Sequence, residues 1–345
     1  MHPWFLSGNF GFKLNLKKCE LLPLDLDADL SCFPVEMERI TRLSNLGVPI
    51  SHEAWFASSR VKKLMASLKE LECMEHTQSA VLLLKHCFGP LKLNHILRCS
   101  PTHAIAAEIE EMDKAQFECL DNLLRSRVTP SGFEQAHFSS SNGGLGLRLA
   151  SRIAPAAYLG SHISSSEEVS ELLKGRIPSD SGPPIHPQEV LADMNARFGL
   201  SFTLQQGRKL YESGTSSLQG HISDLIETSA LAQFKRTLSS EDLDWLKNVS
   251  KFSHWIDRVP SKLQGTHMNN IDYVTAVQLR LRSVDFLKGS MCVSGKIGQS
   301  RAVPLNAHHC TGCPVGGGIH ARHALLAKTV FEEAEEAALY VLSSP

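Results

Sequence analysis

Hydrophobic and polar positions follow two different periods along this chain. Within residues 10–22, near the N-terminus, apolar side chains beginning with Phe10 and Phe12 occupy every second position. This period of two predicts a strand, because successive side chains of a strand point to opposite faces of a sheet. A second strand-like run covers residues 42–50, where Gly47 marks a tight bend. The pattern therefore predicts a small β element at the N-terminus.

Further along the chain, apolar positions recur every three or four residues, which is the period of an α-helix. The first such helix is predicted to begin at Ser58 or Ser59, either of which could cap it. A second covers residues 78–98 and is expected to break at Gly89-Pro90, because proline removes a helical donor. Further helices are predicted within 139–161 and at 103–127, 188–199, 217–237, 240–258, 269–288 and 322–342. The predicted fold class is mainly α.

Composition narrows the class of protein only slightly. Of the 345 residues, 42% are hydrophobic and 21% are charged, as in an ordinary globular chain. No apolar run is long enough to span a membrane, and the first residues lack the pattern of a signal peptide, so no membrane partner is expected. The nine cysteines do not suggest a disulfide framework, and several lie in predicted helices, where cysteine is usually a small core residue. These are Cys73, Cys87, Cys99 and Cys119. An intracellular location is expected, with nucleus and cytoplasm unresolved.

Charge points to local patches rather than to a basic protein. Lysine and arginine number 35 against 36 acidic residues, and the formal net charge is −1. Residues 58–100 differ, because seven basic side chains and three acidic ones give this segment a net charge of +4. Contact with nucleic acid would therefore depend on one local surface.

Seven segments carry a pattern whose order along the chain is informative. They are "GFKLNLKKCEL" (11–21), "LSNLGVPI" (43–50), "RVKKLMASLKEL" (60–71) with "AVLLLKHCFGPLKLNHILRCSP" (80–101), "NGGLGLRLASRIAPAAYLGS" (142–161), and "SHWIDRVPS" (253–261) followed by "YVTAVQLRLRS" (273–283). In this order they resemble the C-terminal part of reverse transcriptases from non-LTR retrotransposons, the kind whose tail carries a zinc knuckle and then a restriction-like endonuclease.

The resemblance assigns a role to each segment. The first looks like the end of the palm after the catalytic aspartates, with matches at Gly11, Asn15, Lys18, Cys19 and Glu20. The second is similar to the primer-grip hairpin, the next two to thumb helices, and the later ones to the connector before the knuckle. The implied division is 1–57 for a palm remnant with a primer-grip-like hairpin, 58–135 for a helical thumb, 136–270 for a helical connector with a Pro/Ser/Gly linker near 178–187, and 271–345 for a degenerate knuckle and a C-terminal helix.

Polymerisation in this family depends on paired aspartates that hold two metal ions. The family places them just before the segment matched by residues 11–21, and the ten residues that precede Gly11 contain no acidic side chain. Asp25, Asp27 and Asp29 follow the strand and are expected in a solvated loop. No catalytic residue is therefore assigned, and no polymerase activity is expected from this chain alone.

Binding of a nucleic-acid backbone does not need those aspartates. In the family, a thumb helix presses against the template–primer duplex, and lysines on one face would neutralise phosphates without reading sequence. The resemblance makes Lys62, Lys63, Lys69 and Lys92 the candidate contacts with an RNA or DNA template–primer. The alternative for these residues is an ordinary solvated helix face. No small-molecule substrate is evident.

A run of histidine, cysteine and glycine at 308–323 matches the family's zinc knuckle. The resemblance assigns Cys292, His309 and Cys313 as zinc ligands, while Ser294 occupies the place of the fourth. Zinc favours thiolate and imidazole over a hydroxyl, so the site lacks one ligand unless a neighbour replaces it. The candidate replacements are His308 and Cys310. A degenerate loop without zinc is the alternative.

A thiol–imidazole pair for nucleophilic catalysis could be drawn from the same run, with Cys310 or Cys313 beside His320 or His323. Nearness in sequence does not supply the required geometry, and no orienting acid is nearby. The sequence instead favours a retroelement-derived fragment with residual nucleic-acid binding. Its rivals are a polymerase part that acts only with a separate palm domain, and a non-catalytic interaction protein or inert product.

Overall fold

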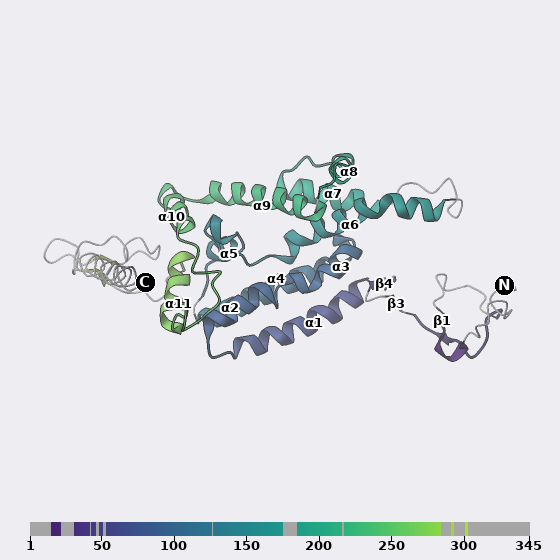
Figure 1. Cartoon of the computed structure of the whole chain (residues 1–345), viewed down its shortest axis with the longest axis horizontal. Helices are drawn as coiled ribbons and strands as arrows, with labels where there is room; N and C mark the ends of the chain where they lie inside the picture. Colours follow the sequence, from purple (N-terminus) through teal and green to yellow (C-terminus); the bar gives the residue numbers. More distant parts are fainter. Residues whose placement is uncertain are drawn as a thin grey trace, which may run out of the picture. The chain divides into compact units, whose positions relative to one another are not determined.

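A computed structural model describes residues 15–21, 31–41, 43–45, 48–50, 53–125, 127–174, 185–215, 217–283, 291–292 and 301–302. Over these residues the protein is mainly helical, with short strands toward the N-terminus (Figure 1). This confirms the predicted fold class.

The N-terminal strands are short and form separate pairs. β1 (Glu20–Leu21) pairs with β2 (Glu38–Arg39) in parallel, whereas β3 (Leu43–Asn45) pairs with β4 (Val48–Ile50) in antiparallel register. The hairpin expected within residues 42–50 is therefore present.

The strand expected over residues 10–22 is largely wrong where the structure describes it. Residues Leu16–Lys18 form the 3₁₀ helix η2, and of the described residues in this range only the two of β1 belong to a strand. Local hydrogen bonds favour a 3₁₀ turn over a strand here, because the backbone N–H groups of Lys18 and Cys19 donate to carbonyls three residues earlier.

The helices follow one another with short connections through most of the chain. They are α1 (Glu53–Glu72), α2 (Thr77–His86), η3 (Pro90–Leu93), α3 (Asn94–Cys99), η4 (Thr102–Ile105), α4 (Ala106–Leu124), α5 (Pro130–Ala136), η5 (Ser140–Asn142), α6 (Ala150–Leu173), α7 (Ile185–Phe198), α8 (Leu204–Glu212), α9 (Leu218–Thr237), α10 (Ser240–Lys251) and α11 (Asn270–Arg280). A last strand pair joins β5 (Met291–Cys292) to β6 (Arg301–Ala302).

Several helix boundaries differ from the prediction. α1 begins at Glu53, so Ser58 and Ser59 lie inside the helix and do not cap it. The expected break at Gly89-Pro90 is confirmed, because α2 ends at His86 and a 3₁₀ turn begins at Pro90. α5 and α8 were not predicted. The sequence could have indicated the start of α8, since Thr203 and Gln206 form a capping box there.

The chain divides into two compact units, each built from separate segments. Unit 1 comprises residues 1–65, 92–112 and 150–225, and unit 2 comprises residues 66–91, 113–149 and 226–345. Their boundaries fall within α1, α4 and α9. Of the predicted linker, residues 185–187 form the first turn of α7, and residues 178–184 lie outside the described part. The four-part functional division remains a prediction.

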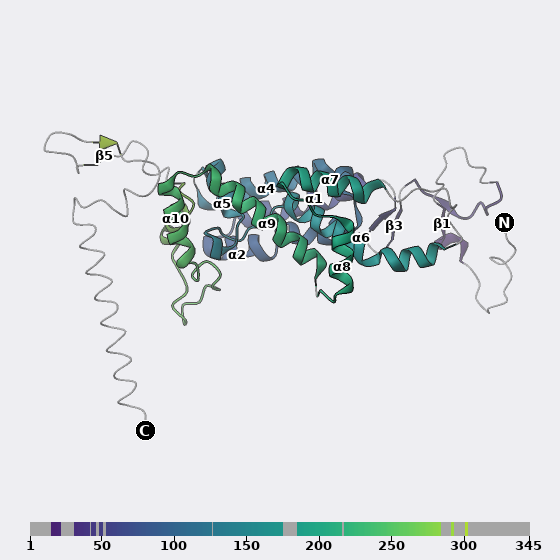
Figure 2. The ribbon, with the colours of Figure 1, turned by 90° about the horizontal axis from the view of Figure 1, so that it is seen from above.

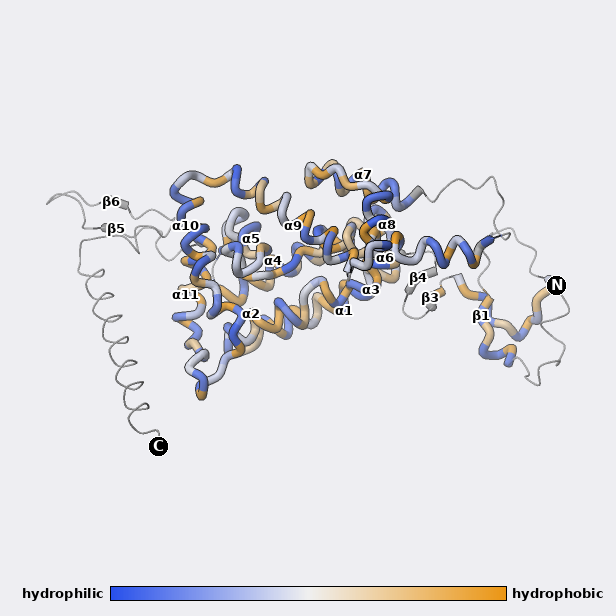
Figure 3. Tube along the Cα trace, turned by 45° about the horizontal axis from the view of Figure 1, so that its top comes forward, coloured by the Kyte–Doolittle hydropathy of each residue, from blue (hydrophilic) through white to orange (hydrophobic). Residues whose placement is uncertain are grey.

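Unit 1 is organised around α6, which packs along α3 and also contacts α7 and α8. Small buried side chains on α6, including Ala156 and Ala157, allow close approach of its neighbours. A Cβ on Gly160 would lie 3.0 Å from the backbone of Gln219, so only glycine fits without displacement there. The end of α6 beyond Ile163 is hydrophilic and largely exposed (Figure 3).

Unit 2 is tied together by polar contacts as well as by its apolar core. The α2 side chain of Gln78 is buried, donates to the Thr266 carbonyl at 3.0 Å and accepts from the Met268 backbone N–H at 3.0 Å. The backbone N–H of Thr77 donates to the Asn270 side chain at 2.9 Å. The bond from Thr77 pairs one of the first N–H groups of α2, which have no partner within the helix. They join α2 to the segment that leads into α11.

Candidate nucleic-acid interface

All four lysines proposed as phosphate contacts are exposed. Lys62, Lys63 and Lys69 lie on α1, and Lys92 lies on η3. Lys62 and Lys69 are seven residues apart in one helix, so they lie on the same face. The apolar side of α1 is buried instead, through Val61, Leu64, Leu68 and Leu71. Helix α1 (Figure 2) is therefore amphipathic as predicted, with Lys62, Lys63 and Lys69 exposed to solvent.

Lys69 has a carboxylate partner one turn further along α1. Its Nζ lies 3.1 Å from Oε1 of Glu72, and the Lys69 side chain is 62% exposed while that of Glu72 is 15% exposed. The hydrogen bond to Glu72 raises the pKa of Lys69, so the amine stays protonated. An exposed pair of this kind contributes little to stability, and a phosphate could replace Glu72 as the partner.

Lys92 belongs to an element that packs against the first half of α1 within unit 1. Ala57 and Val61 of α1 line a small apolar space together with Leu93, Ile96 and Leu97. The exposed positions Lys92, His95 and Arg98 follow one another at intervals of three residues in this neighbouring segment. Basic side chains are therefore exposed on two adjacent elements of unit 1.

Parts of four of the quoted segments meet in unit 2. Arg280, in the "YVTAVQLRLRS" segment, donates to the backbone carbonyl of Gly144 in the glycine loop (residues 142–146) and to that of Ser140 just before it. Asp257, in the "SHWIDRVPS" segment, accepts from the Ser140 hydroxyl at 2.5 Å and pairs with Lys85 of α2. Motifs far apart in sequence therefore share one hydrogen-bonded network.

The Asp257 carboxylate predicts a pH dependence of stability. Burial raises the pKa of Asp257, but hydrogen bonds from Lys85 and Ser140 outweigh burial, and the pKa lies below its usual value. A depressed pKa in the folded state stabilises the protein above the unfolded pKa, which is about 4, and this contribution disappears as the pH falls through the folded pKa. We expect stability in urea to decline from about pH 4 downward. Asp257→Asn should reduce that decline, and an equally steep decline in the variant would contradict this role.

The glycine loop shows why its residues are small. Gly146 adopts φ +75°, and a Cβ there would lie 2.6 Å from Nζ of Lys85. Gly143 adopts φ +89°, and a Cβ there would lie 2.5 Å from Leu246. The left-handed backbone favours glycine at both positions. The close neighbours constrain them less, since the nearest atoms are the flexible ends of the Lys85 and Leu246 side chains.

The residues of the predicted knuckle are mostly outside the described chain. Cys292 lies on β5, directly opposite Arg301 of β6 in the antiparallel pair. His309 and Cys313, together with Ser294, lie outside the described residues. The same holds for the acidic loop at Asp25 and for the predicted C-terminal helix.

The structure brings together one group that could hold a metal ion and that the sequence did not predict. It consists of His103 on η4 and of His186 and Glu189 in the first turns of α7. His186 and Glu189 are three residues apart and share a helix face, which the sequence could have indicated. His103 lies 83 residues away, and only the tertiary fold of unit 1 makes it a neighbour.

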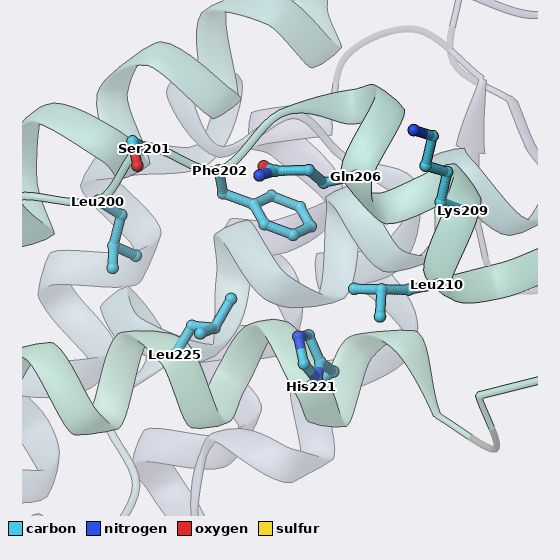
Figure 4. A pocket seen from close by; sticks show the side chains of 8 residues that line it. All are labelled: Leu200, Ser201, Phe202, Gln206, Lys209, Leu210, His221 and Leu225. Atoms are coloured by element: carbon cyan, nitrogen blue, oxygen red, sulfur yellow. The ribbon is translucent and has the colours of Figure 1, made fainter. Parts of the chain in front are cut away.

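A cavity of about 500 Å³ opens between the α7–α8 loop, α8 and α9 in unit 1 (Figure 4). Its walls are largely apolar, through Leu200, Phe202, Leu210 and Leu225. Polar atoms reach it from other lining residues: Ser201, Gln206, Lys209 and His221. This arrangement can accept an apolar group that carries a hydrogen-bonding end.

The helical cysteines are less buried than expected. Cys119 is fully buried, and burial raises the pKa of its thiol to about 12, which makes it unreactive. Cys73 and Cys99 are exposed and Cys87 is half-buried. The core interpretation is therefore correct for Cys119 and wrong for Cys73 and Cys99, because Cys73 lies in the turn after α1 and Cys99 is the last residue of α3, and both positions are exposed.

Within the described segments, every helix is too short or too polar to cross a bilayer. No model of a protein family matches this chain, and neither does any curated protein or solved structure.

Proposed function

We propose that this chain is a fragment derived from a non-LTR retrotransposon reverse transcriptase and that it binds the sugar–phosphate backbone of an RNA or DNA template–primer. The observation that carries the proposal is the exposure of Lys62, Lys63 and Lys69 along α1, opposite a buried apolar side. Lys92 extends the basic set on the adjacent element of unit 1.

The proposed binding depends on the positive charge of the lysines and not on a shaped pocket. Lysine ammonium groups neutralise phosphates and release the counterions condensed around a nucleic acid, so affinity falls as salt rises. They do not read base edges, so little sequence preference is expected. Since the formal net charge of the whole chain is −1, binding depends on this local surface.

The segments on which the resemblance depends also contact one another in unit 2. Three of them contribute Lys85, Asp257 and Arg280 to one set of contacts around the glycine loop.

The lysines can be tested by the salt dependence of binding to a labelled RNA–DNA duplex. We expect Lys62→Gln/Lys63→Gln/Lys69→Gln to make the slope of log K against log salt less steep by about 2 to 3 units, at roughly 0.9 per lost phosphate contact. The measurement is fluorescence anisotropy over a series of salt concentrations.

A matched control removes the same charge elsewhere. Lys114, Lys247 and Lys251 are exposed, and the first two pair with carboxylates one turn away on their own helices, as Lys69 does. Their triple glutamine variant should keep the wild-type slope. Equal slopes for all three proteins, or no binding at low salt, would refute the proposed interface.

The rival functions predict other results. A polymerase part that acts with a separate palm domain should extend a primer when that domain is supplied, and the α1 variant should lower this activity. A protein-interaction scaffold should show no salt-dependent binding to nucleic acid. The resemblance also implies that zinc at the knuckle would be held by Cys292, His309 and Cys313, and metal analysis of Cys292→Ser/Cys313→Ser tests this assignment.

A further inference from the structure

Three metal-binding side chains, two imidazoles and one carboxylate, converge on the surface of unit 1. Nε2 of His103 lies 3.1 Å from Nδ1 of His186. Oε2 of Glu189 lies 3.5 Å from the His103 nitrogen and 3.7 Å from the His186 nitrogen. One carboxylate oxygen and one nitrogen from each ring thus form a nearly equilateral triangle.

The size of this triangle matches the coordination sphere of a small divalent ion. Its three sides place one point about 2.0 Å from all three atoms, close to the distances of about 2.0–2.2 Å at which zinc binds imidazole nitrogen and carboxylate oxygen. An ion displaced slightly from the plane of the triangle would reach all three atoms without any movement of the backbone. The outer side would stay open to water.

The elements that carry the ligands are ordered by unrelated contacts. α7 is anchored in the core of unit 1 by Val190 and Met194, and η4 is anchored by Ile105. The side chains themselves remain accessible, with 43% of His103, 59% of His186 and 53% of Glu189 exposed. An ion could therefore enter from solvent, and the fold has already brought the two elements together.

The donor set selects the class of ion. Two imidazoles and one carboxylate suit divalent transition metals such as Zn²⁺, Co²⁺ or Ni²⁺, whereas Mg²⁺ and Ca²⁺ prefer oxygen ligands only. Three protein ligands with an open position are also the arrangement found where a metal keeps a bound water.

We propose that His103, His186 and Glu189 bind one divalent transition-metal ion, which links η4 to the first turns of α7. Without an ion, the two ring nitrogens are joined by a 3.1 Å hydrogen bond, and the Glu189 carboxylate lies 3.5 and 3.7 Å from them. With an ion, all three lone pairs point at one cation and the two elements are cross-linked.

Titration of the full, untagged chain with Co²⁺ and Zn²⁺ tests the site. We expect His103→Ala and Glu189→Ala each to lose one equivalent of bound metal relative to the wild type, while His254→Ala, which removes an exposed histidine of unit 2, keeps it. Bound Co²⁺ should show nitrogen and oxygen coordination, with two imidazoles detected by pulsed electron paramagnetic resonance. Zn²⁺ should also raise the thermal midpoint of the wild type more than that of either variant.

Cysteines near the C-terminus could bind metal independently, so the same titration is made with Cys292→Ser/Cys313→Ser. The proposed equivalent should survive these substitutions, and its Co²⁺ spectrum should then lack thiolate charge-transfer absorption. If His103→Ala and Glu189→Ala both bind as many equivalents as the wild type with the same affinity, the three side chains form a hydrogen-bonded cluster only and the proposal is overturned.

Discussion

Replacing Arg280 with methionine should lower the free energy of unfolding by about 3–5 kcal/mol, because it removes buried charge-assisted hydrogen bonds and leaves their acceptors unpaired. The Arg280 guanidinium donates to the carbonyls of Gly144 at 3.0 Å, Val249 at 2.7 Å and Ser140 at 2.6 Å. Methionine fills similar space and donates to none of them. One side chain therefore ties α11 to the glycine loop and to the end of α10.

The charge on Arg280 sets the size of this effect. Burial lowers the pKa of Arg280 to about 10, and the nearby Asp257 carboxylate partly opposes this shift. The guanidinium is still protonated at neutral pH, so all of its donors are available. Removing a buried charge also removes its desolvation penalty, which is why the expected loss is smaller than three full charged hydrogen bonds would suggest.

Urea denaturation followed by circular dichroism measures the effect. Arg258→Met is the matched control, since Arg258 lies in the same unit and is exposed, and a change within about 0.5 kcal/mol is expected there. Arg280→Lys retains the charge but cannot reach three carbonyls in the same geometry, so it should recover only part of the loss. A loss below about 1 kcal/mol in Arg280→Met would show that the network contributes little.

Gly144→Ala should destabilise the protein by about 3 kcal/mol or more, because overpacking against backbone cannot be relieved by a side-chain rotation. An added Cβ would lie 2.0 Å from the Phe138 carbonyl oxygen and 2.4 Å from that of Gln135. These carbonyls belong to the end of α5 and the residues just beyond it. The loop also supplies N–H donors there, since Leu145 and Gly146 donate to the carbonyls of Ala136 and Phe138.

Gly214→Ala separates this clash from ordinary glycine effects. Gly214 has φ +82° and no atom near its added Cβ, so alanine there should lose only about 1–2 kcal/mol from the left-handed backbone. Thermal unfolding of both variants gives the comparison. Equal midpoints for the two would mean that the loop shifts away from α5 and that the close approach does not constrain the sequence.

The sequence could predict what depends on local periodicity. Helical spacing of Val61, Leu64 and Leu68 located the body of α1 and its exposed lysines, because an amphipathic helix buries one stripe wherever it packs. Gly89-Pro90 predicted a break for an equally local reason. Helix ends were less accurate: the capping serines lie inside α1, since the preceding residues continue the helix against the core of unit 1.

The sequence by itself determined the mainly helical class, the extended segment within residues 42–50, and the solvent exposure of Lys62, Lys63 and Lys69, because each follows from the pattern of a few neighbouring residues. Tertiary structure alone decided that Arg280 reaches the glycine loop and that His103 meets His186 and Glu189. Such contacts join residues many positions apart, and they form only when the burial of apolar surfaces brings whole helices together. The periodicity of a short segment does not predict which helices will pack against each other.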